Sequence, residues 1–168
     1  TPALLTVLAA GGQGSAAAVA AAAQAFLDTL AASQKTLAQS PSSTTTVLFP
    51  YSAENARAWS SQPGTRHGLR LNRDTLTSAQ LAAADRLISA ALSAQGATQV
   101  SEIRLADDVQ AARTSDVRFG TAMYSIAILG QPSISAPWSL QISGHMLAHN
   151  LSYNTPQAGA TPMFLGSR

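Results

Sequence analysis

Cysteine is absent from this chain of 168 residues. Its absence excludes disulfide bonds, a thiolate nucleophile, a cysteine-held iron–sulfur cluster and a cysteine-ligated zinc site. Chemistry must therefore come from other side chains, and the candidates are its few histidines, carboxylates and tyrosines.

Charge is also scarce, at 11% of residues compared with roughly 25% in an average soluble domain. Ala, Ser, Thr, Gln and Gly replace the missing charged residues, and Lys35 is the only lysine. A polar but nearly uncharged surface is common in exported proteins. We therefore expect an extracellular or periplasmic location.

Positive charge is too sparse for a nucleic-acid-binding surface. The formal net charge is +2, whereas proteins that bind phosphate backbones concentrate many Lys and Arg side chains on one face. The one local cluster consists of Arg66, Arg70 and Arg73 with His67. No nucleic-acid partner is expected.

Long apolar runs are missing as well. The opening stretch TPALLTVLAA is shorter than the ~20 residues that a membrane-spanning helix needs, and no positive residue precedes it as in a signal peptide. We expect no membrane span, and a mature chain that begins at Thr1 after removal of an export signal. Residues 1–14 are expected to form a flexible arm, and residues 15–168 a single α+β domain or a fragment of a longer one.

Apolar spacing changes from helical to strand-like along the chain. Helices are expected at residues 15–40, 52–64, 77–96 and 97–113, with Ser15 and Thr77 or Ser78 as N-caps and Gly96 as a C-cap. Strands are expected within 121–130 and 138–153, where the period is two. This order favours an α+β fold with the N-terminal helices packed on one face of a mainly antiparallel sheet.

The segment GHMLAHN, residues 144–150, contains two histidines four positions apart. On a helix such a pair can share one zinc ion, but on a strand the two Cα atoms stand ~13 Å apart. The alternation around Ile142 predicts a strand, with His145 and His149 on its polar face. A joint zinc site is therefore not expected, and Met146 occupies the place of the glutamate in the zinc-protease motif.

Two other chemistries are weakly marked. A Ser-His-Asp triad stays open because serines are abundant, but no G-x-S-x-G motif is present. A carboxylate pair for glycoside hydrolysis would have to come from residues on expected helix surfaces or loops, where a solvated charge is the usual interpretation. These residues are Glu54, Asp74, Glu102, Asp107, Asp108 and Asp116.

An ordered set of motifs resembles a known family. The set comprises Trp59 with Pro63, RHGLRL, DRLISAALSAQG, YSIAILGQP, WSLQISGHMLAHN and TPMFLGS. It resembles the bacterial and fungal domain of unknown function family 3500, over roughly residues 25–168. Family members tend to be exported, and the resemblance implies no established activity. They usually continue beyond the phenylalanine-leucine-glycine stretch, so we expect this chain to be the N-terminal portion of a longer protein, a processed fragment or a short variant.

The resemblance marks particular positions. Trp138, Gly144, His145 and Asn150 match the best-marked segment, as do Arg66, Gly68, Tyr124, Gly130 and Pro132 elsewhere. Two departures stand out. Met146 replaces a second histidine, and Asp107 or Asp108 stands where a glutamate is expected after IRL.

The expected site gathers His145, Asn150, Arg66 and Tyr124 as catalytic residues, with His145 also a candidate metal ligand. Gly144 is expected to leave room beside His145 for a ligand or another backbone, so that His145 lines a partly exposed cleft. His149 is expected to be dispensable. No cofactor is indicated.

Two hypotheses about function stay open. The first is an exported enzyme, either a hydrolase or a metal-dependent catalyst. The second is a non-catalytic module that binds a small-molecule ligand or assembles with itself outside the cell. The remainder of its own longer chain is a further candidate partner.

Overall fold

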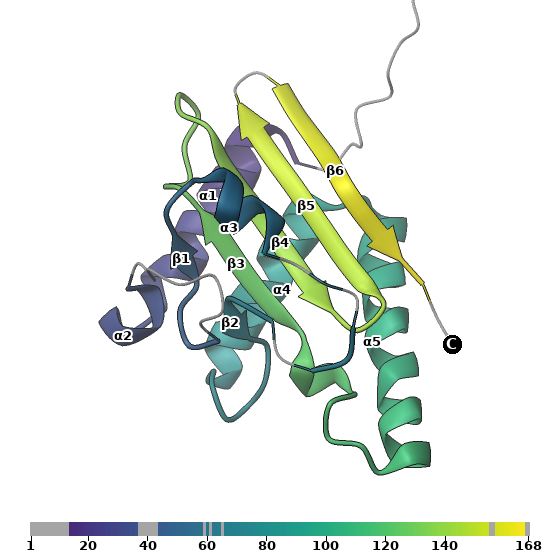
Figure 1. Ribbon diagram of the computed structural model, residues 1–168. Coiled ribbons are helices and arrows are strands. Elements are labelled where there is room, and N and C mark those ends of the chain that lie inside the picture. Colours follow the sequence, from purple (N-terminus) through teal and green to yellow (C-terminus); the bar gives the residue numbers. More distant parts are fainter. Residues whose placement is uncertain are drawn as a thin grey trace, which may run out of the picture.

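The computed structural model describes residues 14–36, 44–58, 60, 62–64, 66–154 and 157–166 (Figure 1). The helices are α1 (Ala16–Asp28), α2 (Ala32–Lys35), α3 (Ala53–Arg57), α4 (Ser78–Ala91) and α5 (Ala94–Thr114), with a 3₁₀ helix at Thr121–Met123. The strands are β1 (Leu48–Phe49), β2 (Leu69–Arg70), β3 (Ser125–Leu129), β4 (Trp138–Gly144), β5 (Leu147–Asn154) and β6 (Gln157–Leu165).

The strands form one sheet in the order β1-β3-β4-β5-β6, and β2 also pairs with β3. The β1–β3 pairing is parallel, whereas β2–β3, β3–β4, β4–β5 and β5–β6 are antiparallel. Helices α1, α4 and α5 lie on one face, and the short α3 lies on the other (Figure 1). The expected α+β fold with a mainly antiparallel sheet is therefore confirmed.

The main core lies between the sheet and the long helices. Alternate sheet residues such as Ile126, Leu140 and Ile142 are fully buried, and they join one apolar cluster with Phe26 of α1 and Leu87 of α4. Their period-two spacing aims one side of each strand at the helices. On the opposite face, a smaller cluster consists of Phe49, Ala127 and Leu129, with Ala56 of α3 packed against it.

Three helix ends differ from expectation. The helix expected at 52–64 is the short α3, which ends at Arg57. The helix expected at 15–40 begins after Ser15 but ends at Asp28, where the Thr29 hydroxyl donates to the Phe26 carbonyl over 2.7 Å. Gly96 does not end α4, which stops before Leu92. Gly96 lies in the first turn of α5, and its N–H donates to the Ser93 cap.

The strand expected at 138–153 is a β-hairpin. β4 ends at Gly144, which pairs with Leu147, so His145 and Met146 form a two-residue turn with Met146 at a positive φ of 60°. Ile142 pairs with His149, which places His149 on the helix-covered face. Its predicted position on the polar face was wrong because the reversal at the turn was not anticipated.

The N-terminal arm and the absence of a membrane span were also expected from the sequence. Apart from Gly14, the expected flexible arm lies outside the described residues. Within the described part of the chain, no helix is long and apolar enough to cross a membrane.

Candidate functional site

A buried imidazole–carboxylate pair lies where α5 meets the β4–β5 turn. Nδ1 of His145 lies 2.6 Å from Oδ1 of Asp107, and the two side chains are 3% and 4% exposed. The other carboxylate oxygen of Asp107, Oδ2, accepts the Gly120 N–H over 2.9 Å. Both oxygens of the carboxylate are thus engaged, which restrains its orientation.

The geometry defines which imidazole nitrogen can act. In the neutral ring, Nδ1–H donates to Asp107, which leaves Nε2 as a proton acceptor. The ring of Phe119 packs edge-on against the imidazole, with centroids 4.8 Å apart and an interplanar angle of 76°. A carboxylate on one side and an aromatic ring on the other limit rotation of the imidazole.

Tyr124 supports the turn from inside the core. Its side chain is fully buried, and its hydroxyl donates to the His145 carbonyl over 2.5 Å. Burial and, after it, the charge of Asp107 raise the pKa of this phenol, so it stays a protonated donor. A Cβ on Gly144 would lie 2.4 Å from Cδ1 of this ring. The expectation that Gly144 leaves room for a ligand was therefore wrong, because Tyr124 fills that space.

Arg66 approaches the same site from the loop before β2. Its Nε donates to the Ser60 carbonyl over 2.6 Å, and it is 6% exposed. Burial lowers the pKa of its guanidinium, while the nearby Tyr124 and Asp107 oppose that effect. Asp107 bonds His145 and Tyr124 bonds the His145 backbone, whereas Arg66 acts on Asp107 and Tyr124 through its charge.

Asn150 belongs to a different cluster. It pairs in register with Gln141, so both project from the sheet face opposite the long helices. The Gln141 side chain hydrogen-bonds with His67 and donates to the Ala56 carbonyl over 3.1 Å. His67 stacks on Phe49 with ring centroids 4.9 Å apart. Asn150 thus lies across the sheet from Asp107 and is not brought to the His145 site.

His145 borders a small recess rather than the expected partly exposed cleft. The recess has a volume of about 10 Å³, which is close to the space one water molecule needs. Its lining residues are Ile103, Ala106, Asp107, Gln110, His145, Met146 and Gly166. The expected open cleft was wrong because α5 covers the imidazole with Asp107.

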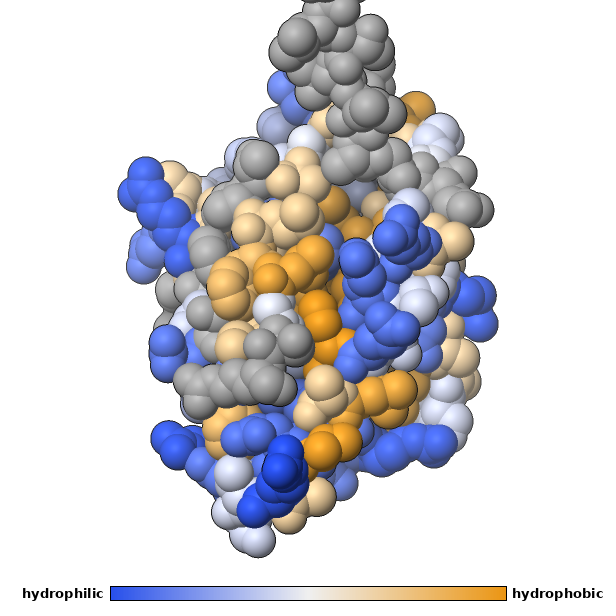
Figure 2. All heavy atoms as spheres, turned by 90° about the vertical axis from the view of Figure 1, so that its right-hand side faces the viewer, coloured by the Kyte–Doolittle hydropathy of each residue, from blue (hydrophilic) through white to orange (hydrophobic). Residues whose placement is uncertain are grey.

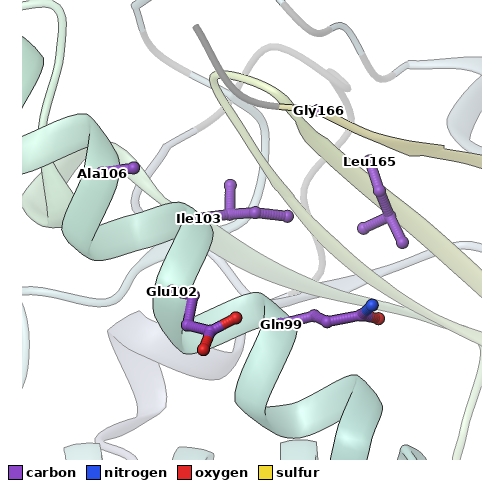
Figure 3. A pocket seen from close by; sticks show the side chains of 6 residues that line it. All are labelled: Gln99, Glu102, Ile103, Ala106, Leu165 and Gly166. Atoms are coloured by element: carbon purple, nitrogen blue, oxygen red, sulfur yellow. The ribbon is translucent and has the colours of Figure 1, made fainter.

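The recess adjoins a longer depression between α5 and β6, which we name the α5–β6 groove. It comprises a pocket of about 390 Å³, which shares Ile103, Ala106 and Gly166 with the recess, and a pocket of about 190 Å³. Those two pockets share Gln99 and Leu165. Figure 3 shows Gln99 and Ile103 extending from α5 toward β6, where Leu165 lies. The groove therefore leads from the His145 recess along the helix.

The surface around the groove is apolar. Figure 2, which faces the α5 and β6 side of the molecule, shows hydrophobic side chains gathered along its centre. The large apolar side chains that line the groove are Ile103 of α5, Met163 and Leu165 of β6, and Leu92 and Leu151; Met163 and Leu165 are 52% and 36% exposed. Gln99 and the carboxylate of Glu102 are polar groups in the wall of the larger pocket. A mainly apolar groove with a few polar groups is the usual form of a small-molecule site.

Asp107 was missed by sequence reasoning, which assigned it a solvated position. It is 5% exposed, whereas the neighbouring Asp108 is exposed and accepts the Thr121 N–H over 2.6 Å. The available signal was helical spacing, because Val100 and Ile103 lie seven and four residues before Asp107 and face the core. A carboxylate at the next position of a core-facing apolar stripe is expected to be buried and to have a hydrogen-bonding partner.

As a candidate metal ligand, His145 contacts the carboxylate of Asp107. Among the residues that the structure describes, no group of three or more histidine and carboxylate side chains is arranged to hold a metal ion. His145 and Asp107 already use one nitrogen and one oxygen on each other. The pair is therefore better suited to proton transfer than to metal ligation.

These features define an α+β protein whose mostly antiparallel sheet carries a buried histidine–aspartate pair beneath its last long helix. The chain belongs to the family described as "Protein of unknown function (DUF3500)", which matches residues 12–168. The resemblance seen in the ordered motifs is thus confirmed. No curated protein and no solved structure gives a significant match to this chain.

Proposed function

We propose that the protein is a hydrolase in which His145, oriented by Asp107, acts as the general base. The observation that carries this proposal is the 2.6 Å contact between the two buried side chains beside a water-sized recess. A carboxylate that fixes the tautomer of an imidazole is the arrangement that hydrolytic enzymes use to activate a hydroxyl or a water.

The proposed reaction is attack of water on an ester carbonyl. His145 Nε2 takes a proton from the water as its oxygen bonds to the carbonyl carbon, and Asp107 stabilises the resulting imidazolium. The imidazolium then gives this proton to the leaving alkoxide as the carbon–oxygen bond breaks. The products are an acid and an alcohol, and the imidazole returns to its neutral form.

The groove supplies the binding surface for such a substrate. Its lining joins that of the recess at Ile103, Ala106 and Gly166, so an ester seated against α5 would lie next to the water-sized recess at the imidazole, and the recess would have to widen to admit the ester carbonyl. Apolar walls favour an aliphatic or otherwise uncharged acyl group. Gln110 adds a side-chain amide at the recess.

Hydrolysis of p-nitrophenyl acetate, butyrate and hexanoate tests the proposal. We expect the protein to hydrolyse at least one of them faster than free imidazole at equal concentration. His145→Gln should lower kcat/KM by about 10²–10⁴, the range typical of general acid–base catalysis. Asp107→Asn should also lower it, because an asparagine cannot stabilise the imidazolium.

Asp108→Asn provides the matched control. Asp108 is the next residue on α5 and also accepts a backbone N–H, but it is exposed and bonds Thr121 instead of the imidazole. Its substitution should leave kcat/KM within about twofold. If His145→Gln hydrolyses all three esters as fast as the wild type, or if the wild type does not exceed free imidazole, the hydrolase proposal is wrong.

We also propose that the protein works outside the cytoplasm, which its low charge and single lysine support. Fractionation of the source cells tests this location. Recovery of the protein from the cytoplasmic fraction alone would contradict it.

A further inference from the structure

His149 is a buried imidazole on the helix-facing side of β5. The residue is 5% exposed, and neither Nδ1 nor Nε2 has a partner among the described residues. Buried polar groups are normally paired, because leaving one unsatisfied costs about 1–3 kcal/mol. An imidazole with two unmet nitrogens therefore requires an explanation other than stability.

The position itself is apolar. His149 pairs with Ile142, and its neighbours on the same face of β5, Leu147 and Leu151, are buried members of the main core. A leucine would continue this pattern without any unsatisfied polar atom. The fold thus accepts a histidine where its own packing favours a hydrocarbon side chain.

His149 is one of the residues that line the 190 Å³ pocket of the α5–β6 groove; its two nitrogens are buried, so the ring must turn slightly to present one of them to a ligand. Most of the wall is apolar, and the polar contributions besides His149 come from Ser93 and Gln99. Oγ of Ser93 accepts the Gly96 N–H over 3.1 Å, so its hydroxyl hydrogen is available to donate. No charged side chain occurs among the described residues that line this pocket.

Burial also determines the form of the ring. Desolvation lowers the pKa of His149, so the imidazole is neutral at physiological pH. A neutral imidazole offers one N–H donor and one acceptor nitrogen. The matching ligand group must donate and accept hydrogen bonds without carrying a charge, and a hydroxyl does both.

We propose that this pocket binds the hydroxyl end of an uncharged aliphatic molecule, with His149 as the polar anchor and the apolar wall around the hydrocarbon. This proposal rests on the proposed function, in which the groove is the substrate site. It adds that the substrate is an aliphatic compound with a free hydroxyl. The binding itself does not require catalysis by His145.

Titration with 1-hexanol tests the site directly. The readout is the ¹⁵N chemical shift of the His149 ring in the full chain, followed by NMR. We expect a saturable shift with 1-hexanol, and binding at least tenfold weaker for hexanoate and for hexylammonium, because neither charge is compensated in the pocket. His149→Leu should weaken 1-hexanol binding at least fivefold when other pocket signals are followed.

Two further variants separate a lost anchor from a damaged fold. His149→Gln keeps a donor and an acceptor and should retain more affinity than His149→Leu. Tyr153→Phe removes a polar atom from the same face of the same strand outside the pocket, and it should bind 1-hexanol like the wild type. If neither His149 variant folds, the wild-type ring shift decides.

The outcomes discriminate between the two proposals. Unchanged 1-hexanol affinity in folded His149→Leu, absence of a ring shift, or equal affinity for hexanoate would overturn the hydroxyl site. If hexanoate bound as tightly as 1-hexanol, the N-terminus of α5 and not His149 would be the group that holds the polar end of the ligand. If 1-hexanol binding depends on His149 but ester hydrolysis does not depend on His145, the hydroxyl site stands and the hydrolase proposal fails.

Discussion

Substitution of Gly144 by alanine should damage the fold at the candidate site. The new Cβ would lie 2.4 Å from Cδ1 and 2.6 Å from Cε1 of Tyr124, far inside van der Waals contact. The ring is fully buried and its hydroxyl is bonded to the His145 carbonyl, so it cannot move aside without breaking that bond. Both packing and a hydrogen bond are therefore lost together.

The expected magnitude follows from these two losses. Overpacking of a well-filled core costs about 1–3 kcal/mol, and loss of the tyrosine hydrogen bond adds about 1 kcal/mol. Gly144→Ala should therefore lower the free energy of unfolding by about 2–4 kcal/mol. In a chain of this size, that corresponds to a decrease in Tm of about 4–16 °C. Urea denaturation and thermal melting followed by circular dichroism measure both quantities.

A double-mutant cycle with Tyr124→Leu tests the cause. With the ring removed, the added methyl group should cost little, which gives a coupling energy of at least about 1 kcal/mol. Gly159→Ala is the matched control, since Gly159 also lies in a strand but a Cβ there has no neighbour within 4 Å. Equal destabilisation by Gly144→Ala in the presence and absence of the Tyr124 ring would refute the reasoning.

Two further predictions concern α4 and His149. Thr77→Ala should lower the free energy of unfolding by about 1 kcal/mol in urea denaturation, because Thr77 and Gln80 form a reciprocal capping box at the start of α4; an unchanged urea midpoint would contradict this. Burial lowers the pKa of His149 below the ordinary 6.5, so the unfolded chain takes up this proton more readily and the wild type loses stability as pH falls below that value. His149→Leu lacks this pH-dependent loss. The difference between the urea midpoint of the variant and that of the wild type should therefore increase as the pH is lowered from about 7.5 to about 5. A difference that stays the same over this range would show that His149 does not titrate in this way.

Local sequence signals predicted much of the fold. Ser15 caps α1 as expected, and Thr77, one of the two residues expected to open α4, is its N-cap, because an N-cap side chain needs only the next turn of backbone. The alternation at residues 138–144 also predicted β4 and its helix-facing side, although its polar side, with Ser139, Gln141 and Ser143, is buried as well. Such signals depend on neighbours within a few residues, which the sequence displays.

Signals that depend on distant partners were harder to interpret. Asp107 is buried because His145 and Gly120 satisfy its oxygens, and neither residue lies near it in the chain. His149 was placed on the wrong face because the turn at His145–Met146 lacks the Asn-Gly or Gly-Gly pair typical of two-residue hairpins. Of the expected site residues, Tyr124 bonds the His145 backbone, whereas Asn150 pairs with Gln141 on the other face of the sheet.

The two-residue turn between β4 and β5 makes chain length at this point more consequential than side-chain identity. The pairing of Gly144 with Leu147 determines which face of the sheet each later residue of β5 lies on. One inserted or deleted residue in the turn would turn the strand over, so that Asn150 faced the helices and His149 faced α3. We therefore expect evolution to accept exchanges of Met146 far more readily than any insertion or deletion between residues 144 and 147.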